Sequence, residues 1–409
     1  MHSWPDIYVP PVSADFPNLS LFSTYQKTLQ YVDSSETINI YVCGITPYDA
    51  THCGHAATYI SFDLIHRYLK CSGKTVNLIE NITDIDDPLL ERASRDSIDW
   101  QELAMSQIDL FRSDMTALHV LPPSYYIGAI ESMAEVFKQI KIFNSKGLTY
   151  ELNGDLYLSI AECEGAIVNL PHDLTESLRI FKERGGDPDR VGKKHPLDTL
   201  LWLKARAGEP SWDSPFGAGR PGWHIECAAI ALKYATENRD SVLTIQGGGS
   251  DLIFPHHYMS AVQGKSLTGR EFAQIYSHTG MIGLDGEKMS KSKGNLVFVS
   301  KLLADGVDPV IIRVGLMREH YRTDRMWSGA GLASSEEDVA RIRKALSREV
   351  VAPSVPLIEK IVLALSKDLD TPEVFKLINQ WCSDTENGGE GGSAGEVARA
   401  LDALLGLTF

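Results

Sequence analysis

A strand–helix–strand pattern between residues 38 and 82 constrains the fold more than any other feature of the chain. The run INIYVCGI (38–45) is short, apolar and β-branched, and residues 55–73 have helical spacing that ends at Gly73. TVNLIENI (75–82) again has the character of a strand. Two strands joined by one helix over so short a stretch are typical of a βαβ unit in a parallel sheet. The pattern therefore predicts an α/β protein with a doubly wound parallel sheet.

The rest of the chain extends this core and interrupts it once. Residues 100–120 and 126–147 are expected to be helical, and VLTIQGGG (242–249) resumes the strand character. Residues 148–200 break the alternation with short strand candidates and a polar turn, which predicts an inserted module. From about residue 297 the chain is expected to be helical.

These patterns divide the 409 residues into six expected parts, the last of which contains a glycine-rich, flexible link (386–396) before a final amphipathic helix. The parts are an N-terminal arm (1–36), the first half of the α/β core (37–147), the inserted connective module (148–200), the second half of the core (201–285), a lysine-rich loop with a helical region (286–345) and a C-terminal helical bundle (346–409).

Composition narrows the class of protein. The hydrophobic fraction of 43% and the charged fraction of 23% are those of an ordinary soluble globular protein. No apolar run reaches the ~18 residues that a membrane span needs, and the first residues lack the regions of a signal peptide, so we expect a cytoplasmic protein without a membrane partner. The six cysteines form no CxxC pair and are expected to be free thiols or metal ligands. The net charge of −15 lowers the expectation of a nucleic-acid partner.

Two histidines mark the junction between the first strand and its helix. His52 and His55 stand in CGITPYDATHCGHAATY (43–59), and Gly54 between them lets backbone approach a ligand closely. Imidazole donors at a helix N-terminus can bind phosphate oxygens as charge develops on them. Helix capping or surface placement would account for the two histidines equally well.

A lysine-rich loop, GEKMSKSKGN (286–295), is the second motif. Lys288, Lys291 and Lys293 stand between two glycines, together with two serines. Such a cationic loop is suited to closing on a triphosphate and offsetting the charge of its cleavage. Taken alone, it would be interpreted as a solvated surface loop.

Together, and in this order, the two motifs resemble the paired HxGH and KMSKS signatures of class I aminoacyl-tRNA synthetases. Cys53 is the one departure, because isoleucine or leucine is usual there. The resemblance implies a synthetase-type Rossmann-like fold and ATP with Mg²⁺ as a substrate. It also implies catalytic roles for His52, His55, Lys288 and Lys291.

Within that superfamily the chain is most similar to the cysteine-activating branch, through YVCGITPYD, NITDIDD, ERGGDP, RPGWHIECAAI and QGGGSDLIFPHH. The resemblance implies one Zn²⁺ held by Cys43, Cys227 and His256. Zinc binds thiolate strongly, so an open position on such a site can capture a cysteine side chain and reject serine. From the residues alone, two cysteines so far apart would be taken as buried core thiols.

The same resemblance implies the residues that line the aminoacyl-adenylate. Thr83 is expected near the amino group, Trp223 beside the cysteine pocket, Asp251 at the ribose and Ile282 at the adenine. The full expected set is Cys43, Gly44, Ile45, Thr46, Thr58, Asn81, Ile82, Thr83, Trp223, Gly249, Ser250, Asp251 and Ile282.

The paired histidines of FPHHYMSA (254–261) are interpreted as one metal ligand, His256, and one residue, His257, that lies in the pocket wall or supports a metal ligand. In cysteinyl-tRNA synthetases a glutamate four residues after the first histidine completes the metal site, and here Ser260 takes that position. Cysteinyl-tRNA synthetases and the cysteine ligases related to them usually carry glutamate where this chain has Tyr258. The sequence does not explain that tyrosine.

Two kinds of enzyme share these motifs. Cysteinyl-tRNA synthetases charge tRNA, whereas the cysteine ligases of mycothiol biosynthesis pass cysteine to the amine of glucosaminyl-inositol. The sequence motifs HSWP, DDPLLERA and HYRTDRMWS favour the ligases. The short segment that follows the KMSKS motif also favours them. The acidic balance of residues 351–409 is also a poor surface for an RNA stem.

We therefore expect a monomeric, AMP-forming ligase that acts on L-cysteine, ATP and glucosaminyl-inositol. A cysteinyl-tRNA synthetase is the first alternative. A non-catalytic paralogue that binds cysteine or nucleotide is the second, although the intact motifs argue against it.

Overall fold

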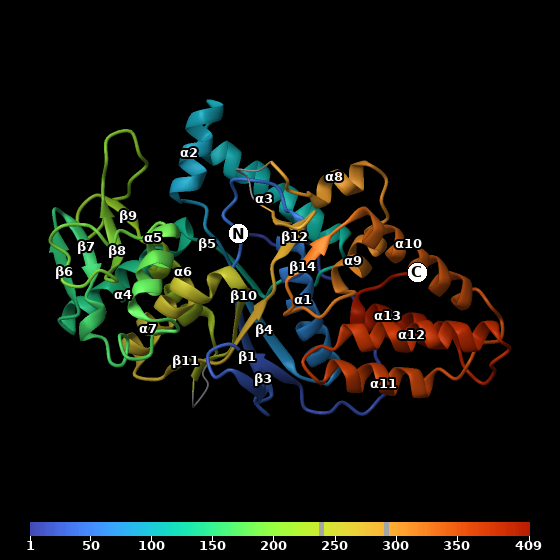
Figure 1. The fold of residues 1–409 in the computed structure, drawn as a ribbon. Coiled ribbons are helices and arrows are strands. Elements are labelled where there is room, and N and C mark those ends of the chain that lie inside the picture. The colour runs from blue at the N-terminus through green and yellow to red at the C-terminus, as the bar shows by residue number, and fades with distance from the viewer. Residues whose placement is uncertain (237–240, 290–293) are drawn as a thin grey trace.

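A five-stranded parallel sheet forms the centre of the molecule (Figure 1). The computed structural model describes residues 1–236, 241–289 and 294–409. The strand order is β11 (Glu271–Thr279), β10 (Ser241–Gly249), β3 (Thr37–Val42), β4 (Thr75–Ile82) and β5 (Tyr125–Gly128). The chain thus adds β4 and β5 on one side of β3, then β10 and β11 on the other. Ligands bind at such a reversal of strand order, outside the carboxyl ends of the strands, which here are the ends of β3 and β10.

Helices cover both faces of this sheet, so the strands are apolar on both sides. Helix α1 (Cys53–Cys71), which joins β3 to β4 as predicted, packs with α3 (Trp100–Ala117) on one face. Helices α6 (Trp223–Tyr234) and α7 (Tyr258–Thr268) lie on the other face. The doubly wound α/β core is confirmed.

The helix expected over residues 126–147 is wrong at its start. Residues Tyr125–Gly128 form the edge strand β5, and α4 begins only at Met133. Strand β5 pairs in parallel with β4, with Ile79 opposite Tyr125. An apolar run of this length has no decisive periodicity, and its pairing with β4 determines its conformation.

A second, antiparallel sheet lies beside the core, on the left in Figure 1. Its strands run in the order β6 (Thr149–Leu152), β7 (Asp155–Leu158), β8 (Thr199–Lys204) and β9 (Gly219–Pro221). This sheet, with α5 (Leu174–Glu183), forms the region where an inserted module was expected, and its strands continue past residue 200. Buried Trp202 and Phe143 pack there with Ile225 of α6, so the region shares a core with the catalytic fold.

The chain after residue 297 is mainly helical, as expected. It contains α8 (Val299–Ala304), α9 (Pro309–Met317), α10 (Gly329–Leu346), α11 (Val355–Leu365), α12 (Thr371–Glu386) and α13 (Ala394–Leu405). The short strand β14 (Arg325–Trp327) is an exception, and it pairs with β12 (Ile282–Leu284). In the part of the chain that the structure describes, no helix has the length and apolar character of a membrane span.

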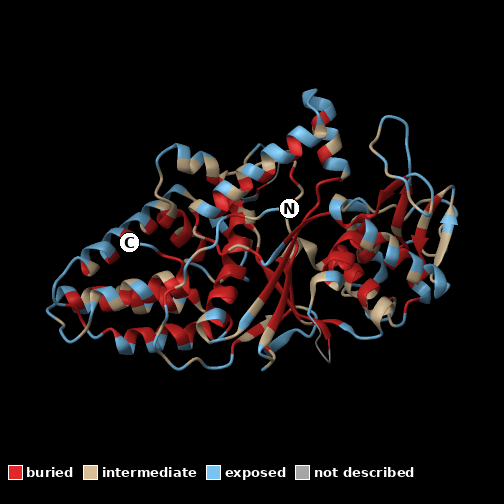
Figure 2. Cartoon of the chain, turned by 180° about the vertical axis from the view of Figure 1, so that it is seen from behind, coloured by how far each residue is buried: buried red, intermediate tan, exposed pale blue. Residues whose placement is uncertain are grey.

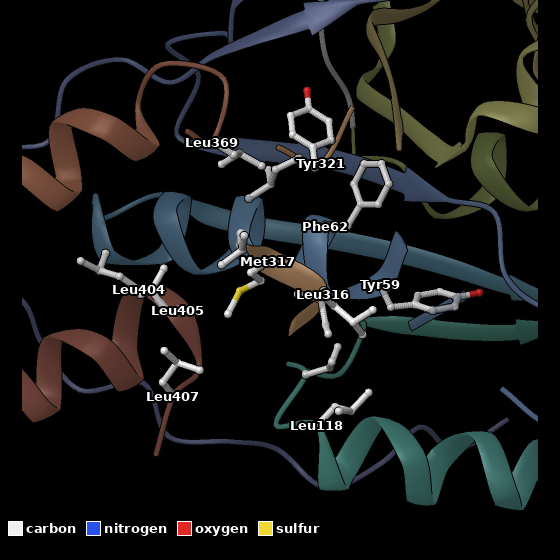
Figure 3. Packing of buried hydrophobic residues seen from close by; sticks show 14 of the residues in the cluster. Tyr59, Phe62, Leu118, Leu316, Met317, Tyr321, Leu369, Leu404, Leu405 and Leu407 are labelled. Carbon is white, nitrogen blue, oxygen red and sulfur yellow. The ribbon is translucent and has the colours of Figure 1, made fainter. Parts of the chain in front are cut away.

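The C-terminal helices dock on α1 through leucines and a buried charge cluster. Leu404, Leu405 and Leu407 share one apolar core with Tyr59 and Phe62 of α1 (Figure 3). The buried sides of the C-terminal helices face one another and the core (Figure 2).

Within that interface Asp63 is bound by two arginines. Arg67 lies 2.8 Å from the Asp63 carboxylate, and Arg313 contacts the same oxygen. Arg313 also donates to the carbonyl of Leu405 at 2.6 Å, which ties the end of α13 to the core.

The expected flexible link between the last two helices is instead a packed turn. The Gly389 amide donates to the Asp384 carbonyl at 2.8 Å, and the Gly392 amide donates to the Val351 carbonyl at 3.1 Å. A Cβ atom on Gly392 would lie 1.9 Å from the carbonyl oxygen of Ala352. The glycines therefore allow close backbone packing here.

The N-terminal arm is also packed. Trp4 is buried, and its indole N–H donates to the Val120 carbonyl at 2.7 Å. The arm ends in a hairpin, β1 (Ser20–Ser23) and β2 (Thr28–Tyr31). This hairpin reaches β11, where the Thr24 amide donates to the Tyr276 carbonyl at 2.9 Å.

Candidate active site and metal centre

Two thiols and an imidazole converge beside the carboxyl end of β3. Cys43 follows β3, Cys227 lies on α6, and His256 lies in the short helical segment η4 (Ile253–His257) before α7. The two sulfurs are 4.0 Å apart, and His256 Nε2 lies 3.1 Å from Cys227 Sγ. All three side chains are buried, and their ligand atoms lie within 4.8 Å of one another. The structure thus brings together the three residues predicted to hold zinc.

The donor set and its spacing fit zinc. Two thiolates bound to one tetrahedral zinc at about 2.3 Å each would lie about 3.8 Å apart, close to the spacing of Cys43 and Cys227. Burial raises the pKa of Cys43 well above its ordinary value. Burial also acts on Cys227, but its contacts with Cys43 and His256 outweigh that effect and hold its pKa well below the ordinary value. A thiolate beside an imidazole is the kind of donor pair that zinc prefers.

The two adjacent histidines diverge toward different sulfurs. His257 Nε2 lies 3.1 Å from Cys43 Sγ, and His257 Nδ1 lies 2.7 Å from His278 Nε2. His278 Nδ1 in turn lies 2.7 Å from the Thr24 hydroxyl. Burial lowers the pKa of His257 well below its ordinary range and that of His278 to about 3, so both rings are neutral. His257, expected either in the pocket wall or in contact with a metal ligand, therefore contacts the predicted ligand Cys43.

Trp223 and His224 fix the orientation of His256. The Trp223 and His256 rings stack with centroids 4.0 Å apart, and His224 Nδ1 lies 2.9 Å from His256 Nδ1. Trp223 was expected beside the cysteine pocket. His224 and His278 were missed, because nothing in their sequence neighbourhood distinguishes them from core histidines.

Ser260 and Tyr258 also receive a structural account. Ser260 has no carboxylate to offer a metal. Its buried hydroxyl instead donates to the carbonyl of His256 at 2.9 Å. The Tyr258 hydroxyl donates to the carbonyl of Ala166 at 2.6 Å. The tyrosine thus ties α7 to the region around the second sheet.

The HxGH histidines stack at the start of α1. Their ring centroids are 3.8 Å apart, and His52 Nδ1 accepts the amide hydrogen of Gly54 at 3.0 Å. A Cβ atom on Gly54 would lie 2.8 Å from the His52 ring, so a larger residue would displace that ring. His52 therefore caps the helix, and this role is compatible with phosphate binding by the same end of α1.

Asn81 links the ends of β3 and β4 through side-chain hydrogen bonds. Its Oδ1 accepts from the Tyr41 hydroxyl at 2.8 Å and from the Gly44 amide at 2.9 Å. Its Nδ2 donates to the Thr83 hydroxyl at 3.2 Å. A Cβ on Gly44 would lie 1.5 Å from the carbonyl oxygen of Asn81, so this approach requires glycine.

The other expected adenylate residues lie around the same strand ends. The Thr83 amide donates to the Ile45 carbonyl at 3.0 Å, and Thr58 Oγ1 lies 2.8 Å from Thr279 Oγ1. The remaining members lie in the loop after β3, at the end of β4, at the end of β10 and in β12: Thr46, Ile82, Gly249, Ser250 and Ile282.

Asp251 forms an ion pair that the sequence did not reveal. Arg184 Nη1, from the loop after α5, lies 3.3 Å from its carboxylate. The segment ERGGDP therefore reaches the end of β10. Of the two lysines of the KMSKS motif that were expected to be catalytic, Lys288 is described in its backbone alone, in β13 (Glu287–Lys288), and Lys291 lies outside the described residues.

Three carboxyl groups with raised pKa values were also missed. Burial raises the pKa of Asp84 and that of Asp86 to about 6 each. Burial, followed by the charge of Cys227, raises the pKa of Glu226 well above its ordinary value. All three residues stand in the quoted motifs NITDIDD and RPGWHIECAAI, but a carboxylate in a motif does not show which way it points.

Comparisons with known proteins agree with this geometry. Residues 30–337 match the family model described as the tRNA synthetases class I (C) catalytic domain. A L-cysteine:1D-myo-inositol 2-amino-2-deoxy-alpha-D-glucopyranoside ligase of Gordonia bronchialis is 50% identical over 417 residues, with 100% of both chains covered. The ligase of the same name from Nocardia farcinica is 48% identical over 414 residues, again with 100% of both chains covered.

Solved structures show the same fold at low identity. Mycobacterium tuberculosis methionyl-tRNA synthetase in complex with methionyl-adenylate matches with a TM-score of 0.63 and 15% identity, over 90% of this chain and 88% of that chain. A leucyl enzyme, the LeuRS of Agrobacterium radiobacter, matches with a TM-score of 0.61 and 12% identity, over 91% and 83%. The chain belongs to the class I (C) tRNA synthetase family and, within it, to the L-cysteine:1D-myo-inositol 2-amino-2-deoxy-alpha-D-glucopyranoside ligases.

Proposed function

We propose that this enzyme activates L-cysteine with ATP and transfers it to the amine of glucosaminyl-inositol, a step of mycothiol biosynthesis. The observation that carries the proposal is the Cys43–Cys227–His256 cluster at the ends of β3 and β10. This cluster lies at the switch point of the sheet, where a nucleotide would bind in such a fold. The proposed thiol-selective pocket and nucleotide site therefore lie at the same edge of the parallel sheet.

Cys43, Cys227 and His256 would hold zinc, which supplies a position for the substrate thiolate and so selects cysteine over serine. Trp223 stacks on His256 and keeps this imidazole in place as a ligand. His257, through its contact with Cys43, does the same for that thiolate. The chain thus positions each ligand with a second residue.

In the first half-reaction the cysteine carboxylate attacks the α-phosphorus of ATP, the bond to the β-phosphate oxygen breaks, and diphosphate leaves. His52 and His55 are proposed to donate to phosphate oxygens from the start of α1, where the helix dipole also favours negative charge. Lys288 and Lys291 are proposed to offset the charge of the departing diphosphate.

In the second half-reaction the sugar amine attacks the activated carbonyl, an amide forms, and AMP leaves as the C–O bond of the mixed anhydride breaks. Asp251 is proposed to hold the ribose hydroxyls, with Arg184 fixing its carboxylate. Thr46, Thr58 and residues 81–83 are proposed to line the adenylate, with Ile282 at the adenine.

Charging of tRNA with cysteine is the second candidate, because the family model is that of a synthetase. Two observations favour the ligase. Ser260 lies where a synthetase places its fourth, acidic ligand, and its hydroxyl is bound to backbone. Residues 351–409 contain nine acidic and four basic side chains, a charge that repels phosphate.

We further propose a monomeric, cytoplasmic enzyme divided as the sequence predicts, except that the inserted module extends to Pro221, with residues 346–409 serving as a structural bundle. The buried contacts of Asp63 and Arg313 support a structural role for that bundle.

Cysteine-dependent exchange of labelled diphosphate into ATP tests the activation step. We expect exchange with cysteine, and at least about 100-fold less with serine, because an alcohol does not bind zinc as a thiolate does. Equal exchange with serine would contradict the proposed thiol selection. Absence of exchange with both would contradict the activation step itself.

A further inference from the structure

Two backbone hydrogen bonds join the HxGH motif to the segment that follows the lysine-rich loop. The Cys53 amide donates to the Val297 carbonyl at 2.8 Å, and the Val299 amide donates to the Thr51 carbonyl at 2.9 Å. Segments 51–53 and 297–299 thus form a short antiparallel ladder. Because the lysine-rich loop ends at residue 295, the ladder connects two motifs that lie more than 200 residues apart in the chain.

The same two bonds complete the starts of two helices. His52 is the N-cap of α1, Phe298 is the N-cap of α8, and the two residues lie opposite each other in the ladder. The first amides of a helix have no partner within that helix. In α1 and α8 these amides belong to Cys53 and Val299, and each binds the other segment. Since Phe298 provides no side-chain cap, the ladder is what satisfies the first amide of α8.

The other end of the lysine-rich loop is anchored on the same core. Strand β13 pairs with β12, and the next residue, Met289, is buried. Met289 shares one apolar cluster with Ile282 of β12, with Ala57 of α1 and with Val299. The start of α1 therefore lies against both ends of the loop.

The ladder is shielded from water on the side of its second bond. Thr51 and Val299 are 2% and 0% exposed. Separating the two segments would leave a buried amide and a buried carbonyl without partners, which costs free energy. The pairing therefore holds the two segments in one relative position.

We propose that this ladder is a positioning element of cysteine activation, and that the Val299 amide is the donor on which it depends. The inference rests on the proposed function, in which the HxGH histidines and the loop lysines act on one triphosphate. Their position relative to each other then decides the rate. A displacement of about 1 Å in such an arrangement can cost about 100-fold.

The metal centre should not depend on the ladder. Cys227 lies on α6, which covers the face of the sheet opposite to α1. A disturbed ladder is therefore expected to slow the step in which diphosphate leaves, while zinc and cysteine still bind.

Val299→Pro tests the donor. Val299 is the first residue of α8, where proline is tolerated, and Phe298 already has the extended conformation that a following proline requires (φ −92°, ψ 136°). The substitution removes the amide hydrogen and directs a ring carbon at the Thr51 carbonyl, so the two segments must separate. Val299→Ala is the matched variant, because it removes the same side-chain packing and keeps the amide.

Leu174→Pro controls for a proline at the start of a helix. Leu174 is the first residue of α5 and is exposed, and the Asp173 cap of that helix binds the Glu176 amide. For all three variants we would measure kcat and KM in cysteine-dependent ATP–diphosphate exchange, zinc content and the unfolding temperature. A second assay would supply synthetic cysteinyl-AMP with glucosaminyl-inositol, which bypasses the release of diphosphate.

Val299→Pro should lower the kcat of exchange about 10- to 100-fold. Its KM for cysteine, its zinc content and its rate of transfer from synthetic cysteinyl-AMP should change less than about threefold. Val299→Ala and Leu174→Pro should change the kcat of exchange less than about threefold. A loss of packing alone would affect both Val299 variants alike, so the difference between them reports the amide.

A kcat of exchange in folded Val299→Pro within about threefold of that in Val299→Ala would overturn the inference. Equal losses of exchange and of transfer from synthetic cysteinyl-AMP would overturn it as well, because such a loss is general. If the proline variant does not fold, replacement of Val299 by the corresponding α-hydroxy acid removes the same hydrogen without the ring and decides by the same criteria. A wild-type enzyme without cysteine-dependent exchange would refute the proposed function, which is a separate outcome.

Discussion

The sulfur of Cys43 lies 4.0 Å from the sulfur of Cys227, although the two residues are 184 positions apart in the chain. Cys43 is placed by the end of β3, where its amide donates to the Gly247 carbonyl of β10 at 3.1 Å. Cys227 is placed by α6, which packs on the face of the sheet that also contains Tyr41. Two parts of a doubly wound fold thus bring together a pair of thiols that neither part could hold alone.

Replacing Cys227 by alanine should remove zinc and cysteine-dependent exchange together, because two of the three donors cannot hold the ion tightly. Metal content of the purified protein, measured by mass spectrometry, checks this. Cys163→Ala is the control, since that thiol is also buried but lies outside the cluster, with the Ser159 carbonyl as its partner. One equivalent of zinc retained in Cys227→Ala would show that the ligands are wrongly assigned.

Replacing His257 by phenylalanine should weaken zinc binding about 10- to 100-fold without abolishing it, because the contact that orients Cys43 is lost while the ligands remain. Competition with a chromophoric chelator measures the affinity. The exposed His172→Gln serves as the control. Loss of all zinc would instead identify His257 as a ligand, and unchanged affinity would show that its contact with Cys43 has no effect on the metal.

The fold was largely accessible from the sequence, because the decisive patterns are local. Residues 75–82 were predicted as a strand and match β4, and the expected helix over 55–73 overlaps α1 closely. Strand β5 was missed because its four residues acquire their conformation from pairing with β4. The supposed flexible link was misjudged for a similar reason, since its glycines serve close packing against Ala352.

The residues of the site could be predicted from the sequence only where they belong to a recognisable motif. Cys43, Cys227 and His256 came from resemblance, and from their residue types alone they would have been taken as core residues. His224, His278 and Arg184 act through contacts between elements far apart in sequence, and no spacing rule identifies such contacts.

Replacing Asp63 by asparagine should lower the free energy of unfolding by about 3–5 kcal/mol, because it leaves Arg67 and Arg313 buried without their carboxylate. Urea unfolding at pH 7 measures the change. Asp305→Asn removes an exposed partner of Lys301 and should cost less than about 0.5 kcal/mol. Equal effects of the two substitutions would contradict the structural role assigned to the buried cluster.

Acidification should destabilise the protein through His66. Burial lowers the pKa of this imidazole to about 4 from an ordinary value of 6.5, so the folded state keeps it neutral. Below pH 6.5 the unfolded chain binds a proton that the folded chain does not, and stability therefore falls as the pH drops from 6.5 toward 4. Between pH 7 and pH 5 the contribution is about 2 kcal/mol.

Urea unfolding of wild type and His66→Gln at both pH values isolates this contribution, since glutamine does not titrate. The variant should lose less stability than wild type over that interval. An identical pH dependence in the two proteins would show that the buried ring is protonated at no cost.

The proposed transfer of cysteine to the amine of a sugar distinguishes this enzyme from a tRNA-charging synthetase. The most direct test incubates the purified protein with ATP, L-cysteine and either glucosaminyl-inositol or tRNA, and follows the products by mass spectrometry. The predicted result is an amide of cysteine with glucosaminyl-inositol, formed with one AMP per product, and no cysteinyl-tRNA. Cysteinyl-tRNA without the sugar amide would contradict the account.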